Sequence, residues 1–489
     1  MPLQTLQVAI FFVVTAFIGL ITYIKCREAS HAADHSVEGE NKEVFLAGGG
    51  LSWIFVAGSI TLTNLSTDQL VGMNGNQMLL LAWWELAAVA GLIILAKVFL
   101  PIYYRYNCTT TTELLEKRYN NHHIRALIGL LFLLGNVFIF LPIVLYTGSL
   151  FMKTMFGLDA SLMTLAIAFA VVGAAYAVLG GLRAVAISDT YSGVLLLSLG
   201  LVVVFLSLKA INFDFSGIPT ERLSMIGDSN SPIPWHTLLT GMILIQIFYW
   251  STNQTITQRA MASPTLKEGQ KGVLTAAVIR FLIVPPLIVL PGVVSYKLYG
   301  DIGDAAYGRI VGDVLPMWLS GAFAAALAAA VLTTFNSILN SSSALYVLDI
   351  HEKYVSKEVS VAKLNAMVTA VFVILALLLV PIYSQSESII NTVQELYGLL
   401  SMPILSCFIV GLMFKNVHYL AAVGAVILGV VLYALLTFWI KPFDLHYIHL
   451  MFGTLWACVL FALGINKWVF GNTAEFSWRE VYSENIAQS

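Results

Sequence analysis

Long apolar stretches with almost no charge follow one another along this chain, and they restrict its fold more than any other feature. A membrane-spanning helix needs about 20 mostly apolar residues, and the sequence contains thirteen stretches of that kind. They are residues 5–24, 51–76, 79–104, 124–153, 160–181, 188–211, 236–258, 273–297, 315–347, 362–384, 390–414, 418–440 and 445–466. Segments of this length satisfy their backbone hydrogen bonds in lipid only as helices. The sequence therefore predicts an all-α integral membrane protein.

The composition excludes the soluble classes of protein. Of 489 residues, 58% are hydrophobic and only 11% are charged, whereas a soluble domain carries about 25% charged residues. A chain this poor in charge is neither a soluble enzyme nor a nucleic-acid binder, and it is too apolar to be disordered. The apolar stretches contain no HExxH, GxSxG or GxxxxGK[ST] motif, which disfavours a membrane-embedded enzyme or an ATP-driven pump.

The basic residues predict how the bundle is oriented. If the N-terminus lies outside, the inner connections carry 17 Lys and Arg residues and the outer connections carry 6. Cytoplasmic loops are enriched in these residues, so we expect the N-terminus outside and the C-terminus in the cytoplasm. The four cysteines lie within helices or at inner ends, and no long glycosylated outer loop is expected, which indicates a bacterial inner membrane.

Two of the apolar stretches carry a polar cluster at mid-length, at residues 61–69 and 249–255. Asn, Ser and Thr side chains compete with helical hydrogen bonding and favour unwinding, and transporters bind their solutes at such broken helices. One broken stretch opens a set of five, and the other opens a second set of five. This is the pattern of the leucine-transporter-type 5+5 inverted repeat, with one helix before it and two after it.

The expected divisions of the chain follow from this pattern. They are an N-terminal helix with a cytoplasmic linker (1–44), a first repeat (45–211), a second repeat (236–414), two C-terminal helices (418–466) and a cytoplasmic tail (467–489).

Specific strings in the two sets resemble the sodium/solute symporter family. They are Phe45-Leu-Ala-Gly48, Asn64-Leu-Ser-Thr-Asp-Gln69, Tyr176-Ala-Val-Leu-Gly-Gly-Leu-Arg-Ala-Val185, Ser188-Asp189, Tyr249-Trp250, Gln258-Arg259, Asp349-Ile350 and Gln394-Glu395. They follow in the family's order from about residue 45 to about residue 415, and they are most similar to the bacterial sodium/galactose and human sodium/glucose cotransporters. The resemblance implies import of a hexose-like monosaccharide, coupled to sodium entering down its gradient, by alternating access.

The resemblance also implies a main sodium site, formed by backbone carbonyls and two hydroxyls. The matching positions are Leu62, Leu65, Ala330, Thr333 and Thr334. Oxygen atoms of this kind suit a small, hard cation, although the two threonines could instead bond only to the preceding helical turn.

A second sodium site is implied at Asp189, with Thr334 and Ser337 as partners. The alternative is that Asp189 is a helix N-cap.

The family's solute-contact positions carry polar side chains that can donate to and accept from hydroxyls. They are Asn64, Gln69, Glu85, Gln246, Arg280 and Gln394, with a gate at Tyr249 beside Trp250. Charges at mid-membrane are expensive and usually paired, so Glu85 and Arg280 form either part of the solute site or a structural salt bridge. Arg also suits a carboxylate, which keeps open an acidic sugar or organic anion as the solute. A channel is the third alternative.

Overall fold

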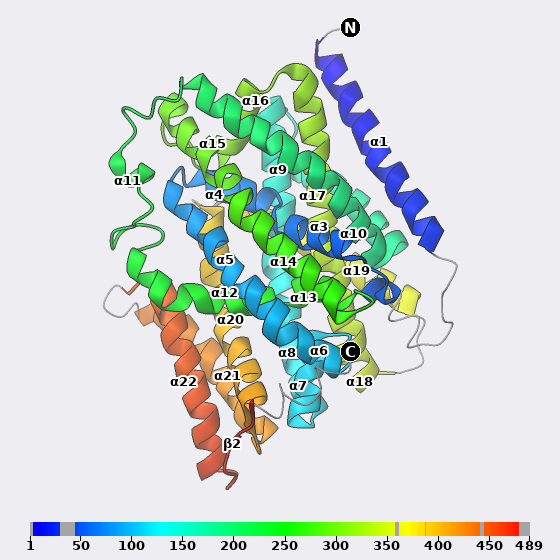
Figure 1. The fold of residues 1–489 in the computed structure, drawn as a ribbon, viewed down its shortest axis with the longest axis vertical. Coiled ribbons are helices and arrows are strands. Elements are labelled where there is room, and N and C mark those ends of the chain that lie inside the picture. The colour runs from blue at the N-terminus through cyan, green and yellow to red at the C-terminus, as the bar shows by residue number, and fades with distance from the viewer. Residues whose placement is uncertain (1–2, 30–44, 357–360, 387, 441–444, 479–489) are drawn as a thin grey trace.

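The computed structural model describes residues 3–29, 45–356, 361–386, 388–440 and 445–478. Residues 30–44 of the expected linker and 479–489 of the expected tail lie outside this part of the chain. Helices make up almost all of it (Figure 1). In the described residues the paired strands are two short ones, β1 (Phe414–Lys415) and β2 (Glu475–Phe476), which run antiparallel.

The helices follow the order that the sequence predicts. α1 (Leu3–Ala29) comes first. The first set comprises α3 (Trp53–Asn64), α4 (Thr67–Gly75), α5 (Trp83–Ile94), α6 (Leu100–Arg105), α7 (Thr111–Tyr119), α8 (His122–Gly135), α9 (Leu141–Phe156) and α10 (Leu162–Ala210). After α11 (Thr220–Leu223), the second set comprises α12 (Gly241–Ser251), α13 (Gln254–Met261), α14 (Leu266–Leu282), α15 (Val284–Tyr299), α16 (Ala306–Val314), α17 (Met317–Ala344), α18 (Glu352–Tyr354), α19 (Val361–Tyr383) and α20 (Ile389–Met413). The last two helices are α21 (Tyr419–Ala434) and α22 (Tyr447–Trp468).

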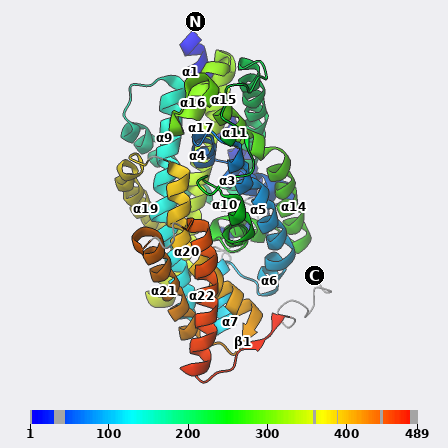
Figure 2. The same ribbon diagram turned by 90° about the vertical axis from the view of Figure 1, so that its left-hand side faces the viewer.

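Short helical segments of other types continue or connect these helices. The 3-10 turns are Ala47–Gly49, Leu79–Ala82, Trp235–Leu239 and Gly303–Ala305, and the π-helical segments are Leu95–Phe99, Asn136–Phe140, Leu345–His351 and Leu435–Ile440. Figure 2 shows α21 and α22 at the end of the bundle opposite the N-terminus, whereas α4 and α17 lie inside it.

The apolar helices agree with the predicted spans. In the part of the chain that is described, nine helices are long and apolar enough to cross a membrane, and four further apolar helices are shorter. Together they coincide one for one with the thirteen predicted stretches. Two of the short ones, α3 and α12, are short because the chain breaks there.

The two predicted breaks are confirmed. Between α3 and α4, Leu65 has φ −86° and ψ 71°, and Ser66 has φ −116° and ψ −174°. Between α12 and α13, Thr252 and Asn253 leave the helical path, and Asn253 Oδ1 accepts a hydrogen bond from the Thr255 amide at 2.9 Å. A polar side chain thus takes over a helix-end amide that the interrupted helix cannot satisfy.

One boundary differs from the prediction. Stretches 160–181 and 188–211 are joined in α10, a continuous helical segment of 49 residues. A straight helix of that length would measure about 74 Å, more than twice the hydrocarbon thickness of about 30 Å, so α10 supplies two spans, Leu162–Tyr176 and Leu182–Ala210. The connection contains no proline that would stop helical hydrogen bonding, while Gly180 and Gly181 permit a bend.

Close backbone contact brings α5 against α12 beside the centre of the bundle. A Cβ atom built on Gly91 would collide with the Gln246 carbonyl oxygen. The Ser251 hydroxyl donates to the Gly91 carbonyl at 3.1 Å. Glycine at position 91 therefore sets the distance between two helices that both supply the central cavity.

Gly91→Ala should destabilise the protein by about 1–3 kcal/mol, since the added methyl group meets backbone that cannot yield. Thermal unfolding of the detergent-purified protein measures the loss. Gly19→Ala in α1 is the matched control, because a Cβ there has no neighbour within 4 Å. Equal unfolding temperatures for the two variants would contradict this account of the α5–α12 contact.

Candidate functional site

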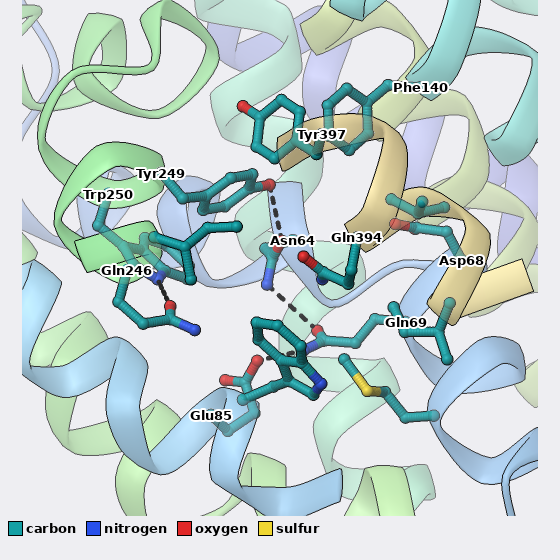
Figure 3. A pocket seen from close by; sticks show the side chains of 15 residues that line it. Asn64, Asp68, Gln69, Glu85, Phe140, Gln246, Tyr249, Trp250, Gln394 and Tyr397 are labelled. Carbon is teal, nitrogen blue, oxygen red and sulfur yellow. Dashed lines mark hydrogen bonds between the residues drawn. The ribbon is translucent and has the colours of Figure 1, made fainter. Parts of the chain in front are cut away.

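A cavity lies beside the two helix breaks. It is lined by polar side chains and aromatic rings, and its volume is about 60 Å³. The lining residues are Asn64, Asp68, Gln69, Met73, Trp84, Glu85, Phe140, Ile245, Gln246, Tyr249, Trp250, Ile390, Val393, Gln394 and Tyr397 (Figure 3). Seven of the eight predicted solute-contact and gate residues are in this set. The exception is Arg280.

Arg280 and Glu85 form a buried ion pair behind the cavity wall. Arg280 Nη2 donates to Glu85 Oε1 at 2.7 Å, and its Nη1 donates to the Thr61 carbonyl at 2.8 Å. The guanidinium carbon lies 4.6 Å from the centre of a Trp250 ring, and Arg280 is 0% exposed. Of the two interpretations that the sequence left open for this pair, the geometry supports a structural salt bridge for Arg280.

Gln69 connects this ion pair to the cavity. Its Oε1 accepts from Arg280 Nη2 at 3.2 Å and from Asn64 Nδ2 at 3.4 Å, and its Nε2 donates to Glu85 Oε1. Glu85 Oε2 is buried and has no hydrogen-bond partner among the described residues. A buried acceptor without a partner is unfavourable, so this oxygen is prepared to receive a donor from a molecule in the cavity.

Aromatic side chains form the opposite wall. The Tyr249 hydroxyl donates to Asn64 Oδ1 at 2.7 Å, which joins α12 to the end of α3. The Tyr249 ring lies edge-on to Trp250 at 5.2 Å and to Tyr397 at 6.0 Å. Trp250 Nε1 donates to Gln246 Oε1 at 2.9 Å. Rings with polar tips cover apolar faces of a ligand and still hydrogen bond at its edge.

Of the residues predicted for the main sodium site, Leu62 and Thr334 meet between α3 and α17. The Thr334 hydroxyl reaches the Leu62 carbonyl at 3.5 Å, and Leu65 lies at the break itself. The Thr333 hydroxyl donates to the Ala330 carbonyl at 3.2 Å. The Thr333 hydroxyl thus bonds to its own preceding turn and also lies near the Asp189 carboxylate, whereas the Thr334 hydroxyl reaches across to the other helix. The donor set of carbonyls and hydroxyls suits sodium.

Of the residues predicted for a second sodium site, Asp189 has one carboxylate oxygen, Oδ1, that is buried without a hydrogen-bond partner among the described residues. Asp189 Oδ2 accepts from the Ser59 hydroxyl at 2.7 Å, and Arg259 Nε donates to the same hydroxyl at 2.8 Å. The Ser337 hydroxyl donates to the Thr333 carbonyl at 2.6 Å, while the Thr63 and Thr333 hydroxyls lie near the Asp189 carboxylate. The interpretation of Asp189 as an N-cap is wrong, because α10 continues through it.

Asp68 is a cavity residue that the sequence analysis did not assign. It lies in the first turn of α4, and its Oδ1 is buried without a hydrogen-bond partner among the described residues. Phe140 and Tyr397 were also not assigned; their rings meet edge-on at 4.8 Å. Asp68 could have been identified from the sequence, because it is a carboxylate within a polar cluster at mid-membrane. Nothing local distinguishes the two rings from other core aromatics.

The far end of α4 is fastened to neighbouring elements. Arg222 donates to the Asn76 carbonyl at 3.2 Å and pairs with Asp301 at 3.0 Å. Asp304 Oδ2 accepts from the Ile389 amide at the start of α20 at 3.1 Å, and burial raises the pKa of the Asp304 carboxyl to about 7. These bonds join the end of α4 to α11, and the connection after α15 to the start of α20.

Comparison with known proteins places the chain in a defined group. Residues 44–429 match the sodium:solute symporter family. The chain is 33% identical to the uncharacterized symporter YidK of Escherichia coli (strain K12), over 99% of this chain and 87% of that protein. It is 30% identical to the sodium/glucose cotransporter of Vibrio parahaemolyticus, over 85% and 82%, and 28% identical to mouse sodium/myo-inositol cotransporter 2, over 80% and 65%.

Solved structures show the same fold. A Na⁺-coupled sialic acid symporter in a substrate-bound, outward-open state superposes with a TM-score of 0.80. The two chains are 18% identical, and the match covers 96% of this chain and 99% of the other. The fold is therefore the leucine-transporter-type 5+5 inverted repeat, as predicted.

Removing one member of the buried ion pair should be more harmful than removing both. Arg280→Met leaves the Glu85 carboxylate buried without its partner, which costs about 3–5 kcal/mol of stability. The double variant Glu85→Gln/Arg280→Met should recover a large part of that loss. Thermal unfolding in detergent measures both variants, and a double variant less stable than Arg280→Met would contradict the pairing.

Proposed function

The chain belongs to the sodium:solute symporter family and is a sodium-coupled solute transporter of the membrane, and we propose that the solute it imports is a neutral, hexose-like monosaccharide or polyol. It is not an enzyme. The observation that carries the proposal is the position of Arg280, whose guanidinium is bound to Glu85 and Thr61 behind the cavity wall.

The charges at the cavity favour a neutral solute over an acidic one. The charged groups that line it are Glu85 and Asp68, whose free oxygens are acceptors. A solute carboxylate would meet these two carboxylates instead of a cation, and like charges in a low-dielectric site repel strongly. A sugar hydroxyl can donate to Glu85 Oε2, so the alternative of an acidic sugar or organic anion is less favourable.

The remaining groups fit a ring with several hydroxyls. The amides of Asn64, Gln246 and Gln394 both donate and accept, and Tyr249 with Trp250 can cover an apolar ring face. Relatives named for glucose and myo-inositol transport agree with a neutral polyol. The sialic acid symporter is similar at only 18% identity, which bears on the fold and not on the solute.

In this proposal one sodium ion is held by the carbonyls of Leu62, Leu65 and Ala330 with the hydroxyls of Thr333 and Thr334. An ion there bridges α3 and α17 at the break. Asn64, which hydrogen bonds to the gate residue Tyr249, directly precedes Leu65. Sodium binding would therefore fix the segment that carries a solute contact, before the two sets of five helices rock around the site.

We also infer an orientation with the N-terminus outside, in a bacterial inner membrane. The excess of basic residues in the proposed inner connections supports this. A bacterial relative that is 33% identical to this chain agrees with this location. So does the absence of a disulfide bond at Cys108, Cys407 and Cys458.

Uptake of radiolabelled glucose, galactose or myo-inositol into proteoliposomes should fall to background when choline replaces sodium. Thr334→Ala should lower uptake at least tenfold at sub-saturating sodium, since it removes a hydroxyl ligand. Ser198→Ala is the matched control, because that exposed hydroxyl only bonds back to the Val194 carbonyl. Uptake of all three solutes that is indifferent to sodium would refute the proposal.

Competition separates the neutral from the acidic solute. Neutral hexoses and myo-inositol should inhibit uptake at lower concentration than glucuronate or sialic acid. Arg280→Lys keeps the positive charge beside Glu85 but not all of the guanidinium contacts, so KM for a neutral solute should rise, and it should rise less than KM for a solute carboxylate bound by Arg280. A carboxylate that binds Arg280 in two-pronged geometry would lose far more affinity, and that result would favour the acidic-solute alternative.

A further inference from the structure

We propose that Asp68 anchors a second bound sodium ion, in a small polar cavity between the solute cavity and α17. Its role in transport rests on the proposed function, but the binding of the ion does not. The site differs from the main sodium site at the α3 break and from the sequence-predicted position at Asp189.

A second, smaller cavity adjoins the solute cavity. Its volume is about 20 Å³. On the same measure, one water molecule needs about 10–15 Å³. Asp68, Phe140 and Tyr249 line both cavities. Asp68 therefore stands in the wall between them, and Figure 3 shows it on the side of the solute cavity away from Glu85. The small cavity has room for a single ion or water molecule.

Asp68 lacks the cationic partner that three other buried carboxylates, Glu85, Asp349 and Asp189, have. Glu85 pairs with Arg280 at 2.7 Å, and Asp349 pairs with Arg125 at 2.6 Å. Asp189 is linked to Arg259 through the Ser59 hydroxyl. In the described residues Asp68 has no ion pair, and its Oδ1 has no hydrogen-bond partner.

The start of α4 stabilises the Asp68 carboxylate only in part. Negative charge in the first turn of a helix is stabilised only modestly, whereas removing an ionised carboxylate from water costs far more unless it is paired. A cation in the adjoining cavity would supply the missing charge.

The composition of the small cavity fits sodium. Its other polar residues are neutral: Thr63, Asn136, Tyr249, Asn253, Thr255 and Thr334. One carboxylate among neutral oxygens matches a hard, singly charged cation, whereas calcium sites collect several carboxylates. No group of three His, Cys, Asp or Glu side chains in the described part of the chain is placed to hold a metal, which argues against a divalent or transition-metal site.

The position would couple the ion directly to the solute. Asp68 precedes Gln69, which contacts both members of the Glu85–Arg280 pair. Thr334 lines the small cavity and also reaches the Leu62 carbonyl of the main site. An ion at Asp68 would thus fix the first turn of α4 from one side while solute contacts it from the other, which gives two sodium ions per solute.

Binding of ²²Na⁺ to the purified full-length protein, measured without solute, tests the proposal. The wild type should bind two ions per protein and Asp68→Asn one. Asp313→Asn is the matched control, because it removes an exposed carboxylate paired with Arg309 at the surface, and it should bind two. Thr255→Val keeps the Asp68 carboxylate and removes a neutral ligand, so the affinity for one of the two ions should fall about tenfold. This variant replaces Asp68→Asn if Asp68→Asn is not monodisperse.

Two ions bound by Asp68→Asn, or only one by the wild type, would overturn the inference. Loss of the second ion in Asp189→Asn but not in Asp68→Asn would also overturn it and would place the ion at Asp189. If the wild type binds two ions and Asp68→Asn one, while no neutral sugar is taken up, the inference stands and the proposed solute is wrong. If sodium-driven sugar uptake is found but Asp68→Asn still binds two ions, only the inference fails.

Discussion

The buried guanidinium of Arg280 is the interaction on which the central cavity depends. It joins four helices, because α14 carries it, α5 supplies Glu85, α3 supplies the Thr61 carbonyl and α12 supplies the Trp250 ring. It also binds Gln69 of α4. A buried charge requires a fixed set of partners, so these five helices hold one arrangement around it. The polar wall of the cavity is a consequence of that arrangement.

The helix breaks supply what an unbroken bundle could not. Continuous helices bond their own carbonyls and amides, and they leave no backbone oxygen for an ion in the middle of a membrane. At Leu65 and Ser66 the chain departs from helical geometry, and the Leu62 carbonyl meets a hydroxyl of α17. The polar residues at 61–69 therefore serve two purposes: they end α3 and they face the cavity.

The fold and much of the site could be predicted from the sequence because their signals are local. Span lengths, polar interruptions and the order of short strings depend on neighbouring residues, and they gave the thirteen spans, both breaks and the family. Side chains such as Asn64, Gln69 and Gln394 were recognisable from their strings. The sequence predicted two separate stretches where the structure has the single helix α10. The residues between those stretches are less apolar, but helical hydrogen bonding continues through them.

The sequence by itself determined that this chain is a helical membrane transporter with two interrupted helices and a small number of interior charges. Only the tertiary structure decided how those charges are used. Arg280 and Glu85 are separated by 195 positions, and whether the guanidinium faces the cavity or the wall depends on how α5 and α14 pack. The same holds for Asp189, which is linked to Arg259 through the Ser59 hydroxyl, and for Asp68, which forms no ion pair in the described chain. Charge compensation acts through space, so residue identity reveals the need for a partner, whereas packing selects which partner is within reach.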